Sequence, residues 1–467
     1  MNGPRPAPRT LARVLVLAVV VCLLLPAGTS ALTDDVTDRE TLRAGTVSDA
    51  AEGTTVVSTQ GYTFRQSVNE KKPARLVAAG PRADTRWVHE SPTRRSWFFD
   101  VDPLPNGTFL VVSPRNDSTL VYEYDPETDS RLWEQRLPFE DTHDVDVLSE
   151  DELVVSHMRA WDEENGTSDD RVVVYNRTRD EVTWSWYYRN HFPADTDGGM
   201  NADWTHTNDV DVLPGGRLLL SPRNFDQVLI VNRSTKEITN RLGRDDDHSI
   251  LEEQHNPDYL VSEDGTPTLL VADSGNDRVV EYAYENGSWT RTWSVGSDSL
   301  TWPRDVDRLP NGNTLITDTL NHRVIEVTPT GEVVWEYYVT WGPYDAERVV
   351  HGDGSSGPTI RDMNASGTYE ITGSAGLTPT DDVRRDRRVA SVVRGTFAGT
   401  PLAGPANEAA VTWSHYSPWI RPVWMGSWDL AFALLAGLLL VGWTVAELGG
   451  VALRRYRHVT VSPPPAD

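Results

Sequence analysis

One pattern recurs along this chain and constrains its fold more than any other feature. Residues 204–233 read WTHTNDVDVLPGGRLLLSPRNFDQVLIVNR, and related versions occupy residues 98–124, 142–175 and 303–327. Each version contains Asp-Val-Asp followed by a turn and two apolar runs, which is typical of an antiparallel β-meander. A four-stranded unit of about 40–50 residues cannot bury both of its faces alone. The repeats therefore predict units that stack around an axis, as in a β-propeller.

The number of repeats predicts the number of blades. A half-pattern at 54–90 resembles the outer strands of a repeat and adds a sixth unit to five full ones. We therefore predict an all-β fold, a six-bladed β-propeller over residues 54–340. Part of the otherwise irregular segment 341–427 is expected to complete the first blade by strand exchange, and the sequence does not show which part. The full repeats cover 96–137, 141–190, 204–243, 254–296 and 302–340.

The N-terminal segment is predicted to enter a membrane. Three arginines precede the apolar run VLVLAVVVCLLL at 14–25, and small residues follow it near Ala31. That order is typical of a signal peptide, and the run is short for a spanning helix, which needs about 20 residues. We expect residues 1–31 to be a signal peptide or an N-terminal anchor. Residues 32–53 are polar and acidic, and we expect them to form a stalk.

The C-terminal segment predicts one transmembrane helix. The run LAFALLAGLLLVGWTVA at 430–446 is uncharged, so residues 428–449 are long and apolar enough to cross a bilayer. Three arginines lie in the tail 450–467. Positively charged flanks stay on the cytoplasmic side. The sequence therefore predicts a protein of the cell membrane, with a cytoplasmic C-terminus and an extracellular propeller.

Charge excludes one class of partner. The net charge is −26 and only three of the 467 residues are lysines, so phosphate backbones would be repelled and no nucleic-acid partner is expected. An acidic, lysine-poor surface is instead typical of a protein that works in high salt, where charge repulsion is screened. Cys22 is the only cysteine, so no intrachain disulfide can form.

Seven Asn-X-Ser/Thr motifs are consistent with an exported and glycosylated domain. They begin at Asn106, Asn116, Asn165, Asn176, Asn232, Asn286 and Asn364.

Three histidines recur at the start of successive blades. His143 and His206 stand just before the first strands of their repeats, and His255 takes the same place in the next one. The first strand of each blade lines the central channel, so these histidines should meet at one mouth. Strand two returns to that mouth, and Arg223 lies at its end. The structural alternative is that His206 only holds the start of its blade by a hydrogen bond. The aspartates of Asp-Val-Asp occur with and without histidine, so we expect them to pin turns or neighbouring blades.

Such a mouth suits an anion with several oxygens. Arginine offers planar, multidentate donors to a tetrahedral oxyanion. Histidine serves as an acid, a base or a nucleophile. Three histidines could also hold a metal ion, but no His-rich short spacing or adjacent carboxylate pattern indicates a metal site, so none is predicted.

Three of these motifs carry a family resemblance. HTND at 206–209, SPRN with its following strand at 221–231 and QHNPDYL at 254–260 resemble the arylsulfate sulfotransferase family, six-bladed propellers of exported bacterial proteins. The resemblance implies transfer of a sulfuryl group from a phenolic sulfate ester to a phenol, with no nucleotide sulfate donor and no cofactor. It also implies a transiently sulfated histidine and ping-pong kinetics.

The resemblance implies a role for each residue at the mouth. His255 would be the nucleophile, and His206 would stabilise the sulfuryl group or protonate the leaving phenol. Arg223 would bind sulfate oxygens. His143 would be a further pocket residue, and substrate contacts are also expected from Asn208 and Asn256.

The chain departs from the family pattern, and other functions stay open. It lacks the separate N-terminal β-domain and the cysteine pair of the bacterial enzymes, and it adds a C-terminal anchor, so the substrate and the oligomeric state are not indicated. An alternative is a non-catalytic surface propeller of the NHL type that binds a ligand or a protein. DSGNDRVVEY at 273–282 and DTLNHRVIEV at 318–327 suggest it. A third hypothesis is a metal-dependent hydrolase or lactonase.

Overall fold

A computed structural model describes residues 8–33, 42–61, 72–90, 97–115, 117–296, 299–373, 389–390, 392–422 and 424–460. By contacts the chain divides into two units, Thr37–Pro379 and a second made of Met1–Val36 with Thr380–Asp467. The first unit is all-β, and the second contains the long helices of the chain.

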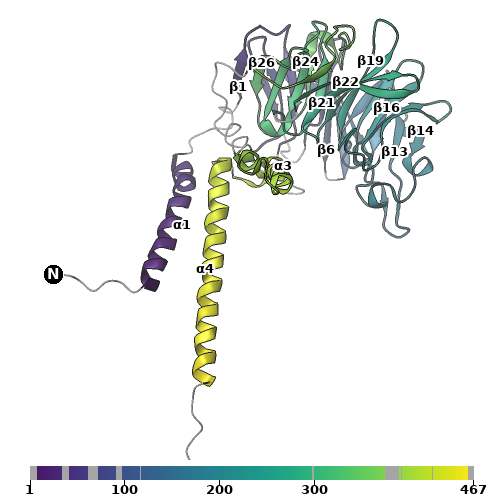
Figure 1. Ribbon diagram of the computed structural model, residues 1–467. Coiled ribbons are helices and arrows are strands. Elements are labelled where there is room, and N and C mark those ends of the chain that lie inside the picture. The colour runs from purple at the N-terminus through teal and green to yellow at the C-terminus, as the bar shows by residue number, and fades with distance from the viewer. Residues whose placement is uncertain are drawn as a thin grey trace, which may run out of the picture. The chain divides into compact units, whose positions relative to one another are not determined.

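The first unit is a six-bladed β-propeller, as predicted (Figure 1). Five blades run in simple sequence order from the innermost strand outwards, each strand antiparallel to the one before it. The first of these blades consists of β5 (Asp100–Pro103), β6 (Phe109–Arg115), β7 (Ser118–Asp125) and β8 (Ser130–Leu137), and the second of β9 (Val145–Ser149), β10 (Glu152–His157), β13 (Arg171–Asn176) and β14 (Glu181–Tyr187). The third consists of β15 (Thr207–Leu213), β16 (Arg217–Pro222), β17 (Gln227–Asn232) and β18 (Ile238–Gly243), and the fourth of β19 (His255–Val261), β20 (Pro267–Asp273), β21 (Arg278–Glu285) and β22 (Ser288–Gly296). The fifth consists of β23 (Pro303–Arg308), β24 (Thr314–Asp318), β25 (Arg323–Val327) and β26 (Val333–Tyr338). A short hairpin, β11 (Trp161–Asp162) with β12 (Thr167–Ser168), is inserted between β10 and β13.

The remaining blade joins the two ends of the propeller. Its outer strands β2 (Thr55–Thr59), β3 (Arg75–Ala79) and β4 (Thr85–Glu90) come from the half-pattern of the sequence. Its innermost strand is β27 (Pro343–Arg348), which pairs antiparallel with β2 so that Arg348 lies opposite Thr55. The strand exchange expected somewhere in 341–427 is therefore made by residues 343–348, and the propeller extends past 340.

Two further strands lie outside the expected pattern. β1 (Arg43–Val47), from the segment predicted to be a polar stalk, pairs with β26 at the outer edge of the last blade. β28 (Gly367–Tyr369) pairs parallel with β22. Residues 43–47 of the expected stalk therefore form a strand of the last blade.

The core of the propeller lies between neighbouring blades. One cluster joins Val174 and Trp186 of the blade β9–β14 to Leu218 and Leu229 of the next blade. Each blade is apolar on both faces because it packs against a neighbour on each side, so a single blade could not bury its apolar residues.

The recurring aspartates pin each innermost strand to the next one. Asp144 and Asp146 of one blade accept the backbone N–H groups of Val210 and Val212 in the next, at 2.5 and 2.6 Å. Asp345 accepts from the N–H of Val101 at 2.9 Å. These bonds satisfy backbone donors that face the channel and have no partner within their own sheet. The predicted role of Asp-Val-Asp in joining neighbouring blades is confirmed at these positions.

The second unit holds α1 (Pro8–Thr33), α3 (Ala403–Ile420) and α4 (Ser427–Thr460). Two stretches in it, Thr10–Leu32 and Ser427–Ala452, are long and apolar enough to cross a membrane by length and composition. An ion pair joins Arg13 to Glu447 at 2.9 Å. Helix α3 lies within 341–427, where the sequence predicted no regular structure.

Candidate active site

The three predicted histidines meet at one mouth of the propeller. His143, His206 and His255 are 5%, 8% and 1% exposed. The ring centroids of His143 and His206 lie 4.9 Å apart. The ring of Tyr344, from β27, lies 5.5 Å from His143 and 5.9 Å from His255. Strand exchange therefore places a tyrosine among histidines that three other blades supply.

The hydrogen bonds of His255 define its tautomer. Its Nδ1 lies 3.0 Å from the carbonyl oxygen of Glu253, which can only accept, and 2.8 Å from the hydroxyl of Ser274. Ser274 donates its own proton to the carbonyl of Pro303 at 2.5 Å. Nδ1 must therefore carry the proton, which leaves the lone pair of the neutral ring on Nε2.

Electrostatics keep His255 neutral. Burial is the largest influence, and the charges of Arg304 and Arg223 add to it, so the pKa of His255 is lowered well below 6.5. A cationic imidazole would lose hydration and face two guanidinium groups. The unprotonated form, which has a nucleophilic nitrogen, is therefore the resting form.

His206 is held by a carboxylate rather than by a carbonyl. Its Nδ1 lies 2.8 Å from Asp203, and Arg159 pairs with the same carboxylate at 3.3 Å. Its backbone is left-handed, with φ of 41°, which is uncommon outside glycine. Burial, followed by the charges of Arg223 and His143, lowers the pKa of His206 well below its usual value.

His143 connects the tyrosine to a buried ion pair. Its Nδ1 lies 2.8 Å from the hydroxyl of Tyr344, and its Nε2 lies 3.6 Å from Asp141. Arg159 donates to Asp141 at 2.5 Å. Burial alone would raise the pKa of Asp141, but hydrogen bonding to His143 and the charges of His143 and Arg159 lower it to about 2. Asp141 therefore stays ionised and orients both partners.

The predicted arginine, Arg223, acts electrostatically on two of the three histidines. Arg223 begins a short 3-10 helix, η4 (Arg223–Phe225), where β16 returns to the mouth. Its Nε donates to Asn224 at 3.0 Å, and Glu253 lies 3.9 Å away. After burial, which is the largest influence, its charge also lowers the pKa of both His206 and His255.

Two residues of the mouth escaped the sequence analysis. Arg304 lies with its guanidinium 4.7 Å from the ring centroid of Tyr344, and both are buried. The signal was present: Arg-Asp-Val-Asp at 304–307 and Tyr-Asp-Ala-Glu at 344–347 repeat the register of His-Asp-Val-Asp at 143–146. The position before the first channel carboxylate is occupied around the ring by Phe99, His143, Asn208, Pro257, Arg304 and Tyr344.

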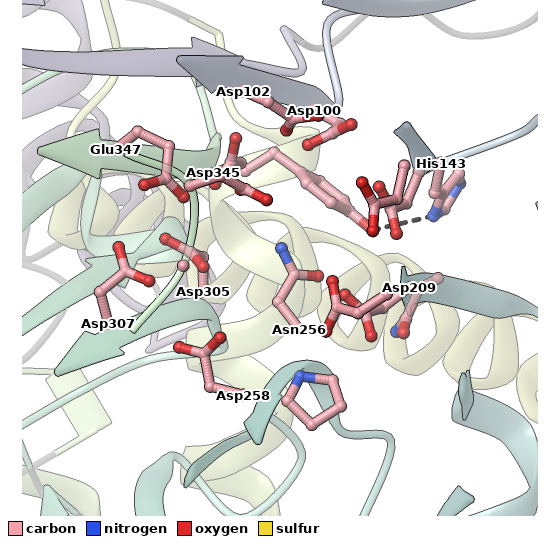
Figure 2. Close-up of a pocket in the computed structure, with 18 residues that line it drawn as sticks. Asp100, Asp102, His143, Asp209, Asn256, Asp258, Asp305, Asp307, Asp345 and Glu347 are labelled. Carbon is pink, nitrogen blue, oxygen red and sulfur yellow. Dashed lines mark hydrogen bonds between the residues drawn. The ribbon is translucent and has the colours of Figure 1, made fainter. Parts of the chain in front are cut away.

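The two predicted asparagines both line the channel pocket, and Figure 2 shows Asn256 within it. Asn208 donates its Nδ2 to the carbonyl of Gln254 at 2.8 Å. Asn256 has a left-handed backbone, with φ of 31°. Beyond them the channel is lined by twelve carboxylates, those of Asp100, Asp102, Asp144, Asp146, Asp209, Asp211, Asp258, Asp305, Asp307, Asp345, Glu347 and Asp353.

The motifs that suggested an NHL-type ligand-binding propeller form bonds within their own blades. Asp273 accepts from Arg278 at 2.6 Å. Asp318 accepts from Arg323 at 2.7 Å, and Arg323 also donates to Glu336 at 2.7 Å. These polar residues support turns and strand ends.

Fold and site together define a six-bladed propeller with histidines and arginines gathered at one mouth. Residues 55–264 match the model of the arylsulfotransferase (ASST) family. This match, over residues 55–264, supports a sulfotransferase function in general terms.

Solved structures that resemble the chain are distant. One is a protein of unknown function from Bacteroides caccae, 12% identical, covering 63% of this chain and 98% of that one, with a TM-score of 0.44. A second is a putative 6-phosphogluconolactonase from Bacteroides fragilis, 13% identical, covering 63% and 98%, with a TM-score of 0.41. A third is virginiamycin B lyase from Staphylococcus aureus, 8% identical, covering 62% and 89%, with a TM-score of 0.37. No curated protein matches the chain.

Proposed function

We propose that the propeller transfers a sulfuryl group from a phenolic sulfate ester to a phenolic acceptor through a sulfated His255, without a nucleotide sulfate donor. The observation that carries the proposal is the environment of His255. Its Nδ1–H is hydrogen-bonded to the carbonyl of Glu253 and the hydroxyl of Ser274. Burial and the charges of Arg304 and Arg223 lower the pKa of the ring and keep it neutral. A neutral imidazole beside fixed cations combines a nucleophile with a binding site for an oxyanion.

In the first half-reaction, Nε2 of His255 attacks the sulfur of the ester. A nitrogen–sulfur bond forms, the bond from sulfur to the phenolic oxygen breaks, and the leaving group departs as a phenolate with the electron pair. Arg223 stabilises the sulfuryl oxygens, on which charge is spread in the transition state. The carbonyl of Glu253 stabilises the Nδ1 hydrogen as the ring gains positive character.

In the second half-reaction, an acceptor phenol attacks the same sulfur and the nitrogen–sulfur bond breaks. The phenolic proton passes to His206, whose low pKa keeps its Nε2 unprotonated and whose Nδ1 is held by Asp203. His206 then releases this proton to solvent, and the phenolate that left in the first half-reaction takes its own proton from solvent. Trapping by mass spectrometry, after aryl sulfate is added without an acceptor, tests the scheme directly: the sulfuryl group should lie on His255 and on no other histidine.

The depressed pKa of His255 predicts an unusual pH profile. Because the neutral ring persists below pH 6.5, kcat/KM for the aryl sulfate should stay level as the pH falls through 6.5 and decline only at lower pH. Arg304→Gln removes the larger of the two cationic influences, so the acid limb should move to higher pH. The measurement is kcat/KM across pH at constant ionic strength. An acid limb at or above 6.5 in the unaltered protein would contradict this account of His255.

We place the reaction outside the cell. The support is the apolar stretch of α4, Ser427–Ala452, together with the arginines that follow it at 454, 455 and 457. On intact cells, a protease that cannot cross the membrane should remove the propeller and leave a C-terminal tag protected. Digestion of the tag with an intact propeller would reverse the orientation.

A further inference from the structure

Many carboxylates line the channel behind the mouth, and the proposed reaction does not use them. Alternate residues of each innermost strand face the axis, so each repeat brings its carboxylates to the channel. Among the described residues that line it, twelve carry carboxylates and only His143 is basic. Figure 2 shows His143 at one end of this pocket and Glu347 with Asp307 at the other. The charge must be compensated by bound protons or by bound cations.

Several oxygens in the channel lack hydrogen-bond donors. Asp144 and Asp345 are occupied by the backbone of neighbouring blades. By contrast, one carboxylate oxygen of Asp209 and one of Asp307 have no hydrogen-bond partner, although these residues are only 6% and 2% exposed. Such orphaned acceptors indicate a missing donor or ion.

An amide oxygen provides an independent observation. Asn208 is fully buried and lines the same channel. Its Nδ2 donates a hydrogen bond to the carbonyl of Gln254, which fixes the orientation of the amide. The amide oxygen, Oδ1, is therefore the acceptor that still needs a donor or an ion. That oxygen has no hydrogen-bond partner. It carries no charge, and a neighbouring carboxylate cannot donate to it unless it is protonated.

We propose that the channel binds hydrated divalent cations of the Mg²⁺ type, with Asp209, Asp307 and the amide oxygen of Asn208 among the groups that hold them. Oxygen-only ligands select hard cations. In the described chain, three or more such side chains bring their ligand atoms within 4.8 Å of one another at Asp226, Asp246 and His248, which do not line the channel. The channel thus lacks a tight cage, and Mg²⁺ is the ion that keeps several waters and binds through one or two carboxylates.

Cation binding should stabilise the folded protein, because the ions bind the assembled ring and not the unfolded chain.

The test uses the full chain in detergent, stripped with a chelator and kept at constant ionic strength with NaCl. Thermal unfolding and calorimetric titration with Mg²⁺ are compared with those of the double variant Asp209→Asn with Asp307→Asn. We expect Mg²⁺ to raise the unfolding temperature of the unaltered protein. Mg²⁺ affinity should fall about 10- to 100-fold in the variant, the usual effect of removing ligands that act through water. Without Mg²⁺ the variant should melt above the unaltered protein, because like charges have been removed.

A matched control removes two exposed carboxylates, with Glu163→Gln and Glu164→Gln, and should leave the Mg²⁺ response unchanged. The proposal is overturned if Mg²⁺ neither binds nor stabilises the unaltered protein, a result that needs no variant. It is equally overturned if binding persists in the channel variant and is lost in Asp246→Asn, which would place the ion at Asp226, Asp246 and His248. Neither readout depends on sulfate transfer, so failure of the proposed enzyme function would not affect the outcome.

Discussion

Replacing His255 by alanine is expected to abolish sulfate transfer. In the proposed scheme this side chain supplies the attacking nitrogen, while His206 and His143 are oriented by their own hydrogen bonds to Asp203 and Tyr344. Loss of a catalytic nucleophile lowers kcat by about 10⁴- to 10⁶-fold. The measurement is release of the chromophore from a chromogenic aryl sulfate in the presence of a phenol. The variant should also fail to form the sulfated intermediate.

Two further variants give this result its meaning. Arg223→Gln should still form sulfated His255 but react about 10²- to 10³-fold more slowly, the usual effect of removing one donor to a developing oxyanion. His191→Ala is the control, because that ring stacks on Trp186 at 4.4 Å, away from the mouth. It should turn over at the normal rate. Full turnover by His255→Ala would exclude this residue as the nucleophile.

Arg323→Met is expected to cost about 3–5 kcal/mol of unfolding free energy. Arg323 pairs with Asp318 and Glu336 at 2.7 Å each, and all three side chains are at most 3% exposed. The substitution leaves two carboxylates buried without their cation, which is far more costly than losing the attraction alone. Urea denaturation of the full chain in detergent measures the loss. It should shrink as the pH falls, because protonation removes the unpaired charges.

The control for this variant is Arg179→Met. Arg179 pairs with Glu181 at 3.2 Å, but the two side chains are 57% and 54% exposed. A pair in water contributes at most about 1 kcal/mol. A loss in Arg323→Met as small as that in Arg179→Met would mean that the buried triad adds nothing beyond a surface pair.

Most of the fold was predictable because each blade repeats a local pattern. The turns, the alternating apolar runs and the histidines before Asp-Val-Asp all lie within a few residues of one another, so the sequence displays them directly. The role of Asp144 and Asp146 in pinning the next blade was also predictable, since the motif recurs in blades that lack histidine. Tyr344 and Arg304 were missed, because residue types other than histidine occupy the equivalent position of their blades.

The sequence by itself determined the class of fold, the six blades and the histidines of the mouth, because hydrophobic periodicity and turn residues act over short distances. Only the tertiary structure decided which segment closes the ring. The pairing of Thr55 with Arg348 joins residues far apart in the chain, and no local preference specifies it. That closure places Tyr344 beside His143 and adds Asp345 and Glu347 to the channel. Burial then keeps the histidines neutral and raises the pKa of carboxyl groups in the channel such as Asp211, because the strength of each charge depends on the water that folding removes.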